Sequence, residues 1–163
     1  MFEDLQVLLE QSVEEVLEKM FFIRSLEEGS EAPGPASDAV KVYVAFEGAA
    51  TGSLQLRVTR DAARSISADF LGTDDSELTG PQVGEVICEL GNMICGAVLS
   101  RVDPAGAFRI SPPQQIADAQ FDAASVDRHS ECARHSMEIA GGHLTILMNT
   151  ETLVCSTAEK HVS

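Results

Sequence analysis

The most regular pattern in the chain is residues 80–102, which read GPQVGEVICELGNMICGAVLSRV. Placed on a helical wheel at about 100° per residue, this stretch separates into two faces, as an amphipathic helix does. The apolar face holds Val86, Ile87, Leu90, Met93, Ile94, Ala97 and Val98. The opposite face holds Glu85, Glu89, Asn92 and Gly96. Residues 80–102 are therefore predicted to form a long helix that packs by one side and presents the other.

Strands and shorter helices are predicted on both sides of that helix. Residues 40–58 alternate apolar and polar side chains about a glycine-containing turn at 48–52, which is typical of a β-hairpin. Apolar residues at three- and four-residue steps predict a helix over 2–20 with a pattern that continues into 21–23, and a shorter helix is predicted over 61–71. After the long helix, residues 107–111 predict a short strand that ends at two prolines.

A second hairpin is predicted over residues 137–148. Gly141 and Gly142 are a signal for a two-residue loop, which would place Ile139 opposite Leu144 and keep one apolar face. Helices and antiparallel hairpins then follow one another along the chain. This order predicts an α+β fold, a largely antiparallel sheet flanked by helices.

The length of the chain predicts one domain over residues 1–163, because ordinary domains run to roughly 100–200 residues. Hydrophobic residues make up 44% and charged residues 23% of the chain, which is the balance of a soluble globular protein. Residues 24–38 combine glycine, proline and acidic residues and predict a mobile loop. Residues 114–131 lack a regular pattern and predict an irregular segment, and residues 156–163 predict a frayed tail.

The formal net charge of −15 argues against nucleic acid and anionic membranes as partners, because both select for basic patches. No apolar run reaches the roughly 18 residues of a membrane span, and the acidic start of the chain does not resemble a secretory signal. Both observations predict a cytoplasmic protein. Free thiols are expected there, because the cysteines show no disulfide spacing.

Two groups of residues raise the question of a metal or redox site. His129, Cys132 and His135 recur at three-residue intervals, but a zinc site needs a fourth ligand, so loop residues are the better interpretation. Cys88 and Cys95 lie beside the polar face of the long helix with no nearby His or Lys to lower a thiol pKa, so they are predicted to be packing residues. No cofactor of the chain's own is expected.

The polar face of the long helix places Glu89 and Asn92 one turn apart, with Gly96 one turn further on. A solvated helix face carries Glu and Asn routinely, and that is the simplest interpretation. Two features favour a functional face instead. Asparagine is unfavourable in mid-helix, and Gly91 and Gly96 each cost about 1 kcal/mol relative to alanine. They indicate a face with accessible backbone to which a partner docks.

Residues 89–97, ELGNMICGA, resemble the Glu-x-x-Asn signature of the CheC/CheX/FliY chemotaxis phosphatases. The context is also similar, because an amphipathic helix, a hairpin and a short helix precede the signature and a strand ending at Ser111 and Pro112 follows it. CheC-like members carry a second signature in the first helix, which this chain lacks, so CheX is the more similar subgroup. One departure is Glu85, where the family often has Asp or Ser.

The resemblance implies a CheX-like fold and hydrolysis of the aspartyl-phosphate of a CheY-like receiver domain. It implies that Asn92 orients the attacking water and that Glu89 pairs with the receiver's active-site lysine. Glu85 and Gly96 would contribute to docking, and Mg²⁺ would come from the receiver. A homodimer is also implied. Two alternatives stay open: a non-catalytic adaptor that binds receivers, and a structural component such as a motor-switch subunit.

Overall fold

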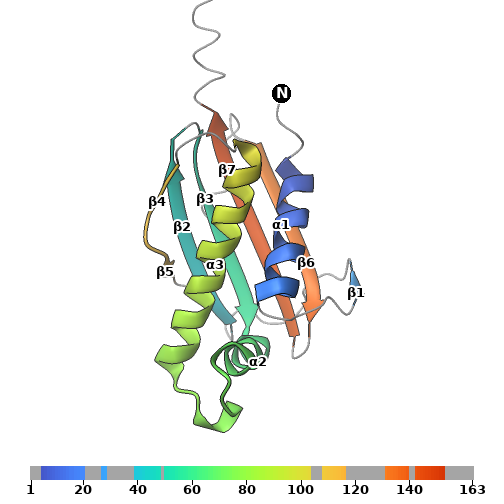
Figure 1. Ribbon diagram of the computed structural model, residues 1–163, viewed down its shortest axis with the longest axis vertical. Coiled ribbons are helices and arrows are strands. Elements are labelled where there is room, and N and C mark those ends of the chain that lie inside the picture. The colour runs from blue at the N-terminus through green and yellow to red at the C-terminus, as the bar shows by residue number, and fades with distance from the viewer. Residues whose placement is uncertain are drawn as a thin grey trace, which may run out of the picture.

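The computed structural model describes residues 5–20, 27–28, 39–48, 50–103, 108–116, 131–139 and 142–152. The helices are α1 (Leu5–Met20), α2 (Arg60–Leu71), the short 3-10 turn η1 (Asp75–Glu77) and α3 (Gly80–Val102). The strands are β1 (Glu27–Glu28), β2 (Ala39–Glu47), β3 (Ala50–Thr59), β4 (Arg109–Ile110), β5 (Gln114–Gln115), β6 (Glu131–Ile139) and β7 (Gly142–Thr152). Figure 1 shows α1 and α3 lying antiparallel over the same face of the sheet, with α2 at one end. The predicted α+β fold is confirmed.

The strands follow the order β1-β6-β7-β3-β2-β4, and β5 also pairs with β2. Every pair that the structure describes is antiparallel. The first hairpin is present as predicted, but its turn is shorter than expected because β3 already begins at Ala50, and this places Val42 opposite Leu56. Alternation along β2 and β3 points side chains such as Val44 and Leu54 toward the helices, where they are fully buried.

The second hairpin is present, but its predicted register is wrong. Met137, not Ile139, lies opposite Leu144, and Ile139 pairs with Gly142. The strands therefore close around residues 140–141, which lie outside the described residues. A shift of two residues keeps the same side chains on the core face, because side-chain direction along a strand has a period of two. For that reason the apolar pattern alone could not distinguish the two registers.

The expected irregular segment 114–131 is wrong at both ends. Residues 114–115 form β5 and pair with β2, and β6 begins at Glu131, so Cys132 and His135 lie in a strand instead of a loop. The strand expected at 107–111 is confirmed only as the two-residue β4. Backbone hydrogen bonds hold β4 and β5 along the edge of β2, so these strands form without the apolar alternation that marks a strand in the sequence. The amide of Ser111 donates to the carbonyl of Ala45 at 2.9 Å.

The other edge of the sheet, along β6, is covered in two ways. Within the expected loop 24–38, residues 27–28 form β1 and pair with Glu138 and Met137 of β6, and the rest of that loop lies outside the described residues. Further along β6, the side-chain amide of Gln6 in α1 donates to the carbonyl of Arg134 at 2.6 Å. The carbonyl of the same amide accepts from the backbone N–H of Arg134 at 3.0 Å. The tail 156–163 also lies outside the described part of the chain.

An ion pair joins α1 to α3. The guanidinium of Arg101 donates to the hydroxyl of Ser12 at 3.2 Å and binds the carboxylate of Glu15. This hydrogen bond from Arg101 lowers the pKa of Glu15 below its ordinary value of 4.5. Apolar side chains pack beneath the pair, since Leu9 and Val13 of α1 and Val98 of α3 are fully buried. The two helices therefore form one layer on the sheet.

Helix α3 meets the length and composition of a membrane-spanning segment, which the sequence analysis did not expect. In the structure its apolar side lies against the sheet, where Leu90, Ile94 and Val98 are fully buried. Its other side carries exposed carboxylates at Glu85 and Glu89. This is the arrangement of a core helix in a globular domain.

Candidate functional site on α3

The first turn of α3 explains why the helix begins where it does. Thr79 and Gln82 form a capping box, in which the amide of Gln82 donates to the Thr79 hydroxyl at 3.2 Å and the Thr79 amide donates to the Gln82 side chain at 2.9 Å. Pro81 occupies the first turn, where its missing N–H leaves no intrahelical bond unmade. The capping box fixes the start of the helix and so determines which residues face solvent.

The structure separates the two faces of α3 as predicted. Glu85 and Glu89 are exposed, Asn92 and Gly96 are half-buried, and Leu90 is fully buried on the sheet side. In a helix, residues three apart have Cβ atoms about 5–6 Å apart, so Glu89 and Asn92 are neighbours on one surface. A carboxylate and a carboxamide are thereby presented together by a helix whose other side is anchored in the core.

The two glycines of this helix have different roles, and the expectation that both belong to a docking face is wrong for Gly91. Gly91 is buried, and a Cβ there would lie 3.3 Å from a methyl group of Val42 and 3.6 Å from one of Val44. It allows α3 to approach the sheet closely. A Cβ at Gly96 would meet nothing within 4 Å, so this residue leaves open space beside Asn92. Only Gly96 belongs to the exposed face.

The thiols beside this face are poor nucleophiles. Partial burial raises the pKa of Cys88 above its ordinary value, and the carboxylates of Glu85 and Glu89 raise it further. Burial raises the pKa of Cys95 to about 12. Both thiols are therefore protonated at neutral pH, as the predicted packing role requires.

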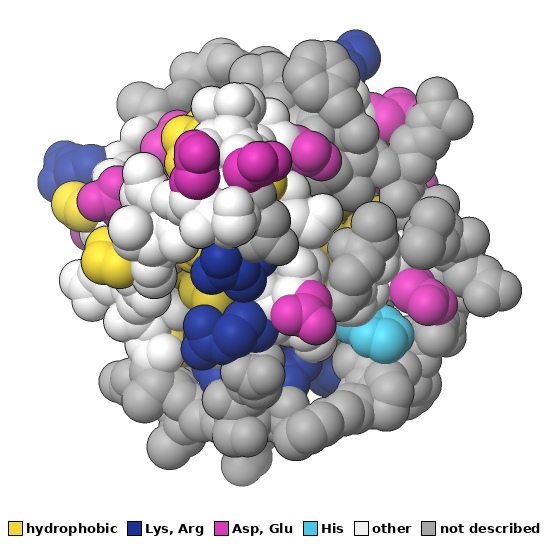
Figure 2. Space-filling model, turned by 90° about the horizontal axis from the view of Figure 1, so that it is seen from below, with side chains coloured by type: hydrophobic (Ala, Val, Ile, Leu, Met, Phe, Trp, Pro, Cys, Tyr) yellow, Lys and Arg dark blue, Asp and Glu magenta, His cyan; other side chains and the backbone are white. Residues whose placement is uncertain are grey.

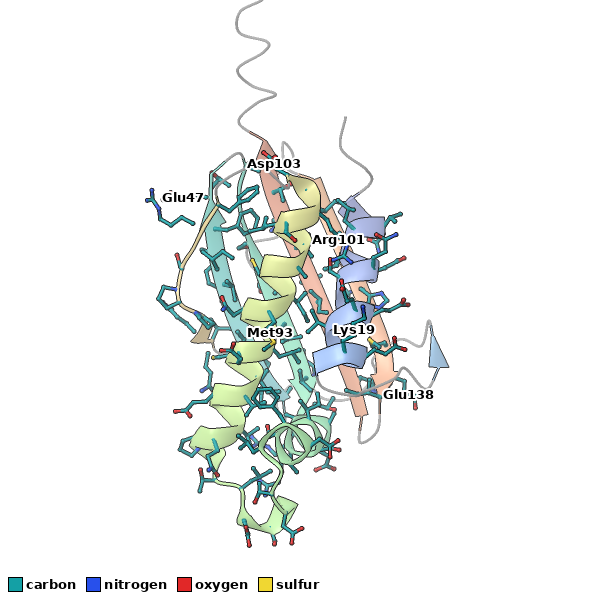
Figure 3. All side chains as sticks on the ribbon, viewed as in Figure 1. Lys19, Glu47, Met93, Arg101, Asp103 and Glu138 are labelled. Atoms are coloured by element: carbon teal, nitrogen blue, oxygen red, sulfur yellow. The ribbon has the colours of Figure 1, made fainter. Side chains whose placement is uncertain are left out.

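A groove of about 370 Å³ lies between α1 and α3, and the sequence analysis missed it. Its walls are Glu15, Val16 and Lys19 from α1, and Met93, Ala97, Ser100 and Arg101 from α3. Met93 and Ala97 had been assigned to the buried face, whereas the structure leaves both half-buried. Figure 3 labels Lys19, Met93 and Arg101 on the two sides of this space. The only signal for the groove in the sequence is a weak one, the presence of small residues on one flank of α3.

The structure describes two of the three residues that the sequence analysis considered as metal ligands and interpreted as loop residues. Cys132 and His135 are three residues apart in β6, so their side chains leave opposite faces of the sheet and cannot bind one ion. The Cys132 thiol instead donates to the side-chain oxygen of Asn149 at 2.8 Å. His129 lies outside the described residues. Among the residues that are described, no cluster of three or more His, Cys, Asp or Glu could hold a metal.

Several Lys and Arg side chains gather at one end of the molecule, although the net charge of the chain is strongly negative. Figure 2, seen from the end where α2 lies, shows Lys and Arg side chains gathered in one group, with Asp and Glu side chains around them. Helix α2 carries Arg60 and Arg64 one turn apart, and both make interactions within the chain. Neither of these arginines is a free cation, and α3 remains the better candidate for function.

Comparison with protein families identifies the fold and its family. The sequence matches the model of the chemotaxis phosphatase CheX over residues 40–135, which is more than half of the chain and includes all of α3. The chain belongs to the CheX family. None of the curated proteins matches it.

Solved CheX structures share the fold at low sequence identity. The CheX chain in the CheX–CheY–BeF₃–Mg²⁺ complex from Borrelia burgdorferi superposes with a TM-score of 0.72 and 19% identity, covering 91% of this chain and 98% of that one. CheX from Desulfovibrio desulfuricans gives 0.65 and 17%, with 90% and 99% covered. A CheC-like protein from Shewanella sp. PV-4 gives 0.65 and 20%, with 93% and 99% covered. These likenesses confirm the CheX-like fold.

Proposed function

We propose that this CheX-family chain hydrolyses the aspartyl-phosphate of a CheY-like receiver domain, with Asn92 and Glu89 as its catalytic residues. One observation carries the proposal: α3 presents a carboxylate and a carboxamide one turn apart, beside the open space at Gly96. Membership of the CheX family supports this chemistry, and the CheX–CheY complex of the Borrelia relative supports a CheY-like partner.

The reaction asks little of the phosphatase beyond positioning. An acyl phosphate is already activated, so its hydrolysis mainly requires a water held in line with the bond that breaks. The water forms a bond to phosphorus as the bond from phosphorus to the aspartyl oxygen breaks. Inorganic phosphate then departs, and the aspartate remains as a free carboxylate. The carboxamide of Asn92 can both donate to and accept from that water. Its helix is anchored on the sheet, which keeps the amide in place.

Glu89 has a different role in the proposal. Its exposed carboxylate pairs with the active-site lysine of the receiver by a charge-assisted hydrogen bond, which fixes the docked geometry. Glu85 lies one turn away on the same exposed face and adds docking charge. The open space at Gly96 lets the receiver approach the backbone of α3 beside Asn92. Mg²⁺ belongs to the receiver, so the chain needs no cofactor of its own.

The proposal has two further parts, the location of the chain and its oligomeric state. A receiver domain acts in the cytoplasm, so we place this chain there. The homodimer that the family resemblance implies also stays a prediction, and light scattering coupled to size-exclusion chromatography tests it. A dimer that extends the sheet would form at one of its edges. Among the described residues each edge is partly covered, one by β1 and Gln6 and the other by β4 and β5.

Phosphate release from a panel of phosphorylated CheY-like receivers tests the proposal. Wild type should accelerate release, and Asn92→Ala should lose about a hundredfold or more of that acceleration, since loss of one group that positions or stabilises the reacting atoms costs this much. Gln11→Ala is the matched control, because Gln11 is an exposed carboxamide on α1. Circular dichroism and thermal unfolding verify that each variant is folded.

The alternative outcomes have distinct meanings. A folded Asn92→Ala variant with full activity overturns the role of Asn92. Binding of a receiver with no change in phosphate release, by wild type and variant alike, favours the adaptor. Assembly that does not depend on phosphorylation favours a structural component.

A further inference from the structure

We infer that the groove between α1 and α3 receives an apolar side chain of the receiver, and that Lys19 pairs with a carboxylate beside that side chain. This inference rests on the proposed function and adds a second point of contact that determines which receivers bind. Three properties of the groove support it: its position, its walls and its charge.

The groove borders the proposed catalytic face. Met93 follows Asn92 in sequence, and Ala97 follows Gly96, so each groove residue is turned by about 100° from a residue of that face. The two surfaces therefore meet along the flank of α3. A receiver that covers Asn92 and uses the open space at Gly96 also reaches the mouth of the groove.

The walls of the groove suit an apolar side chain. Val16, Met93 and Ala97 supply apolar surface, and a volume of about 370 Å³ is at the lower end of the roughly 300–1,000 Å³ of small-ligand sites. The groove is thus wide enough for one or two side chains of a partner. The unbranched thioether of Met93 adapts to side chains of different shape. Small Ala97 leaves the space that a larger residue would fill.

The rim of the groove carries an excess of positive charge in an acidic protein. Arg101 and Lys19 provide two positive charges against the one negative charge of Glu15, and the net charge of the chain is −15. Arg101 is engaged with Ser12 and Glu15, whereas the side chain of Lys19 is 70% exposed and lies 3.7 Å from Glu15. Lys19 is therefore the cation best able to meet a partner's carboxylate.

The docking surface is polarised along α3. The exposed carboxylates of Glu85 and Glu89 lie toward the start of the helix, and the α3 wall of the groove, which Lys19 and Arg101 also line, begins at Met93, past Asn92. A matching receiver surface has a basic group facing the carboxylates and an apolar side chain with an acidic neighbour facing the groove. Complementary charge of this kind sets register and partner choice more than raw affinity.

The first test fills the groove. Ala97→Trp should raise both the KM for the phosphorylated receiver and the Kd for the receiver loaded with beryllium fluoride and Mg²⁺ about tenfold, with kcat unchanged. Gly80→Trp is the matched control, because it adds the same side chain to the same helix at an exposed position about 25 Å away, where a Cβ meets nothing within 4 Å. The control should bind and turn over as wild type does.

The second test uses exposed residues that cannot unfold the core. Lys19→Gln should weaken receiver binding several-fold at low salt, and the difference should disappear at high salt because exposed charges are screened. Glu18→Gln, its exposed neighbour on α1, should not weaken binding.

The outcomes separate this inference from the proposed function. Wild-type affinity in both Ala97→Trp and Lys19→Gln overturns the groove contact, even if Asn92→Ala is inactive. Equal losses in Ala97→Trp and Gly80→Trp also overturn it. If wild type binds a receiver without hydrolysing it and the groove variants bind it less tightly, the groove contact stands and the phosphatase does not. If wild type binds no receiver, or if self-association of the chain alone responds to the groove variants, the inference is wrong.

Discussion

Helices α1 and α3 pack side by side on one face of the sheet, and their buried sides are alike. Their exposed sides both carry carboxylates, yet only α3 has the spacing that the proposed chemistry needs. Glu10 and Glu14 of α1 are followed three residues later by the buried Val13 and Leu17. Glu89 is followed three residues later by the accessible Asn92. The phase of a polar pair relative to the core therefore distinguishes the face on which the catalytic pair is proposed from a solvated face.

The largest expected effect tests the likeness of the buried sides. Leu9→Ala and Leu90→Ala should each lower the free energy of unfolding by about 2–5 kcal/mol, because each removes a fully buried leucine and leaves a cavity. Urea denaturation monitored by circular dichroism measures both. A loss below about 1 kcal/mol for either variant would show that its helix is not part of the common core.

The next effect tests the difference between the exposed sides. Glu89→Gln should weaken binding to a receiver loaded with beryllium fluoride and Mg²⁺ by tenfold or more, because hydrogen bonds to charged groups contribute about 1.5–3 kcal/mol. Glu14→Gln makes the same change at an exposed position of α1 and should alter the Kd less than twofold. Calorimetric titration gives both values. Equal effects would mean that general acidity, and not the position of Glu89, attracts the receiver.

The smallest effect separates the two glycines of α3. Gly96→Ala should stabilise the domain by up to about 1 kcal/mol, since alanine favours the helix and the new methyl group enters open space. The same change should slow phosphate release several-fold if a receiver approaches the backbone there. Gly91→Ala places its methyl group against Val42 and should give little or no stabilisation. A gain in stability at Gly96 with full activity would remove this residue from the docking face.

Local patterns in the sequence predicted the parts of the fold that depend on one segment at a time. The two faces of α3 follow from helical periodicity, and the hairpin of β2 and β3 follows from apolar alternation on both sides of a glycine-containing turn. The predicted end of the short helix at residue 71 is confirmed, and Gly72 closes α2 in the αL conformation. The shared face of Glu89 and Asn92, the proposed catalytic pair, is predicted in the same way, because both residues lie on one helix.

Features that need two distant segments could not be predicted. The groove exists because Ala97 and Ser100 of α3 happen to face Val16 of α1, and neither helix shows this alone. Strands β1, β4 and β5 are two residues long and are defined by their partner strands, not by their own composition. The sequence placed Gly91 with the docking residues, because its contact with β2 depends on a segment far away in the chain.

The bidentate contact of Gln6 with Arg134 gives α1 a task beyond filling the core. The side-chain amide offers one donor and one acceptor to β6, as the peptide unit of a neighbouring strand would. Exposed strand edges are templates on which other chains add and aggregate. Detachment of α1 would uncover the apolar core and, in the same event, return these peptide groups to solvent. Local unfolding of α1 is therefore expected to expose an apolar surface and a strand edge together, the two features that promote aggregation.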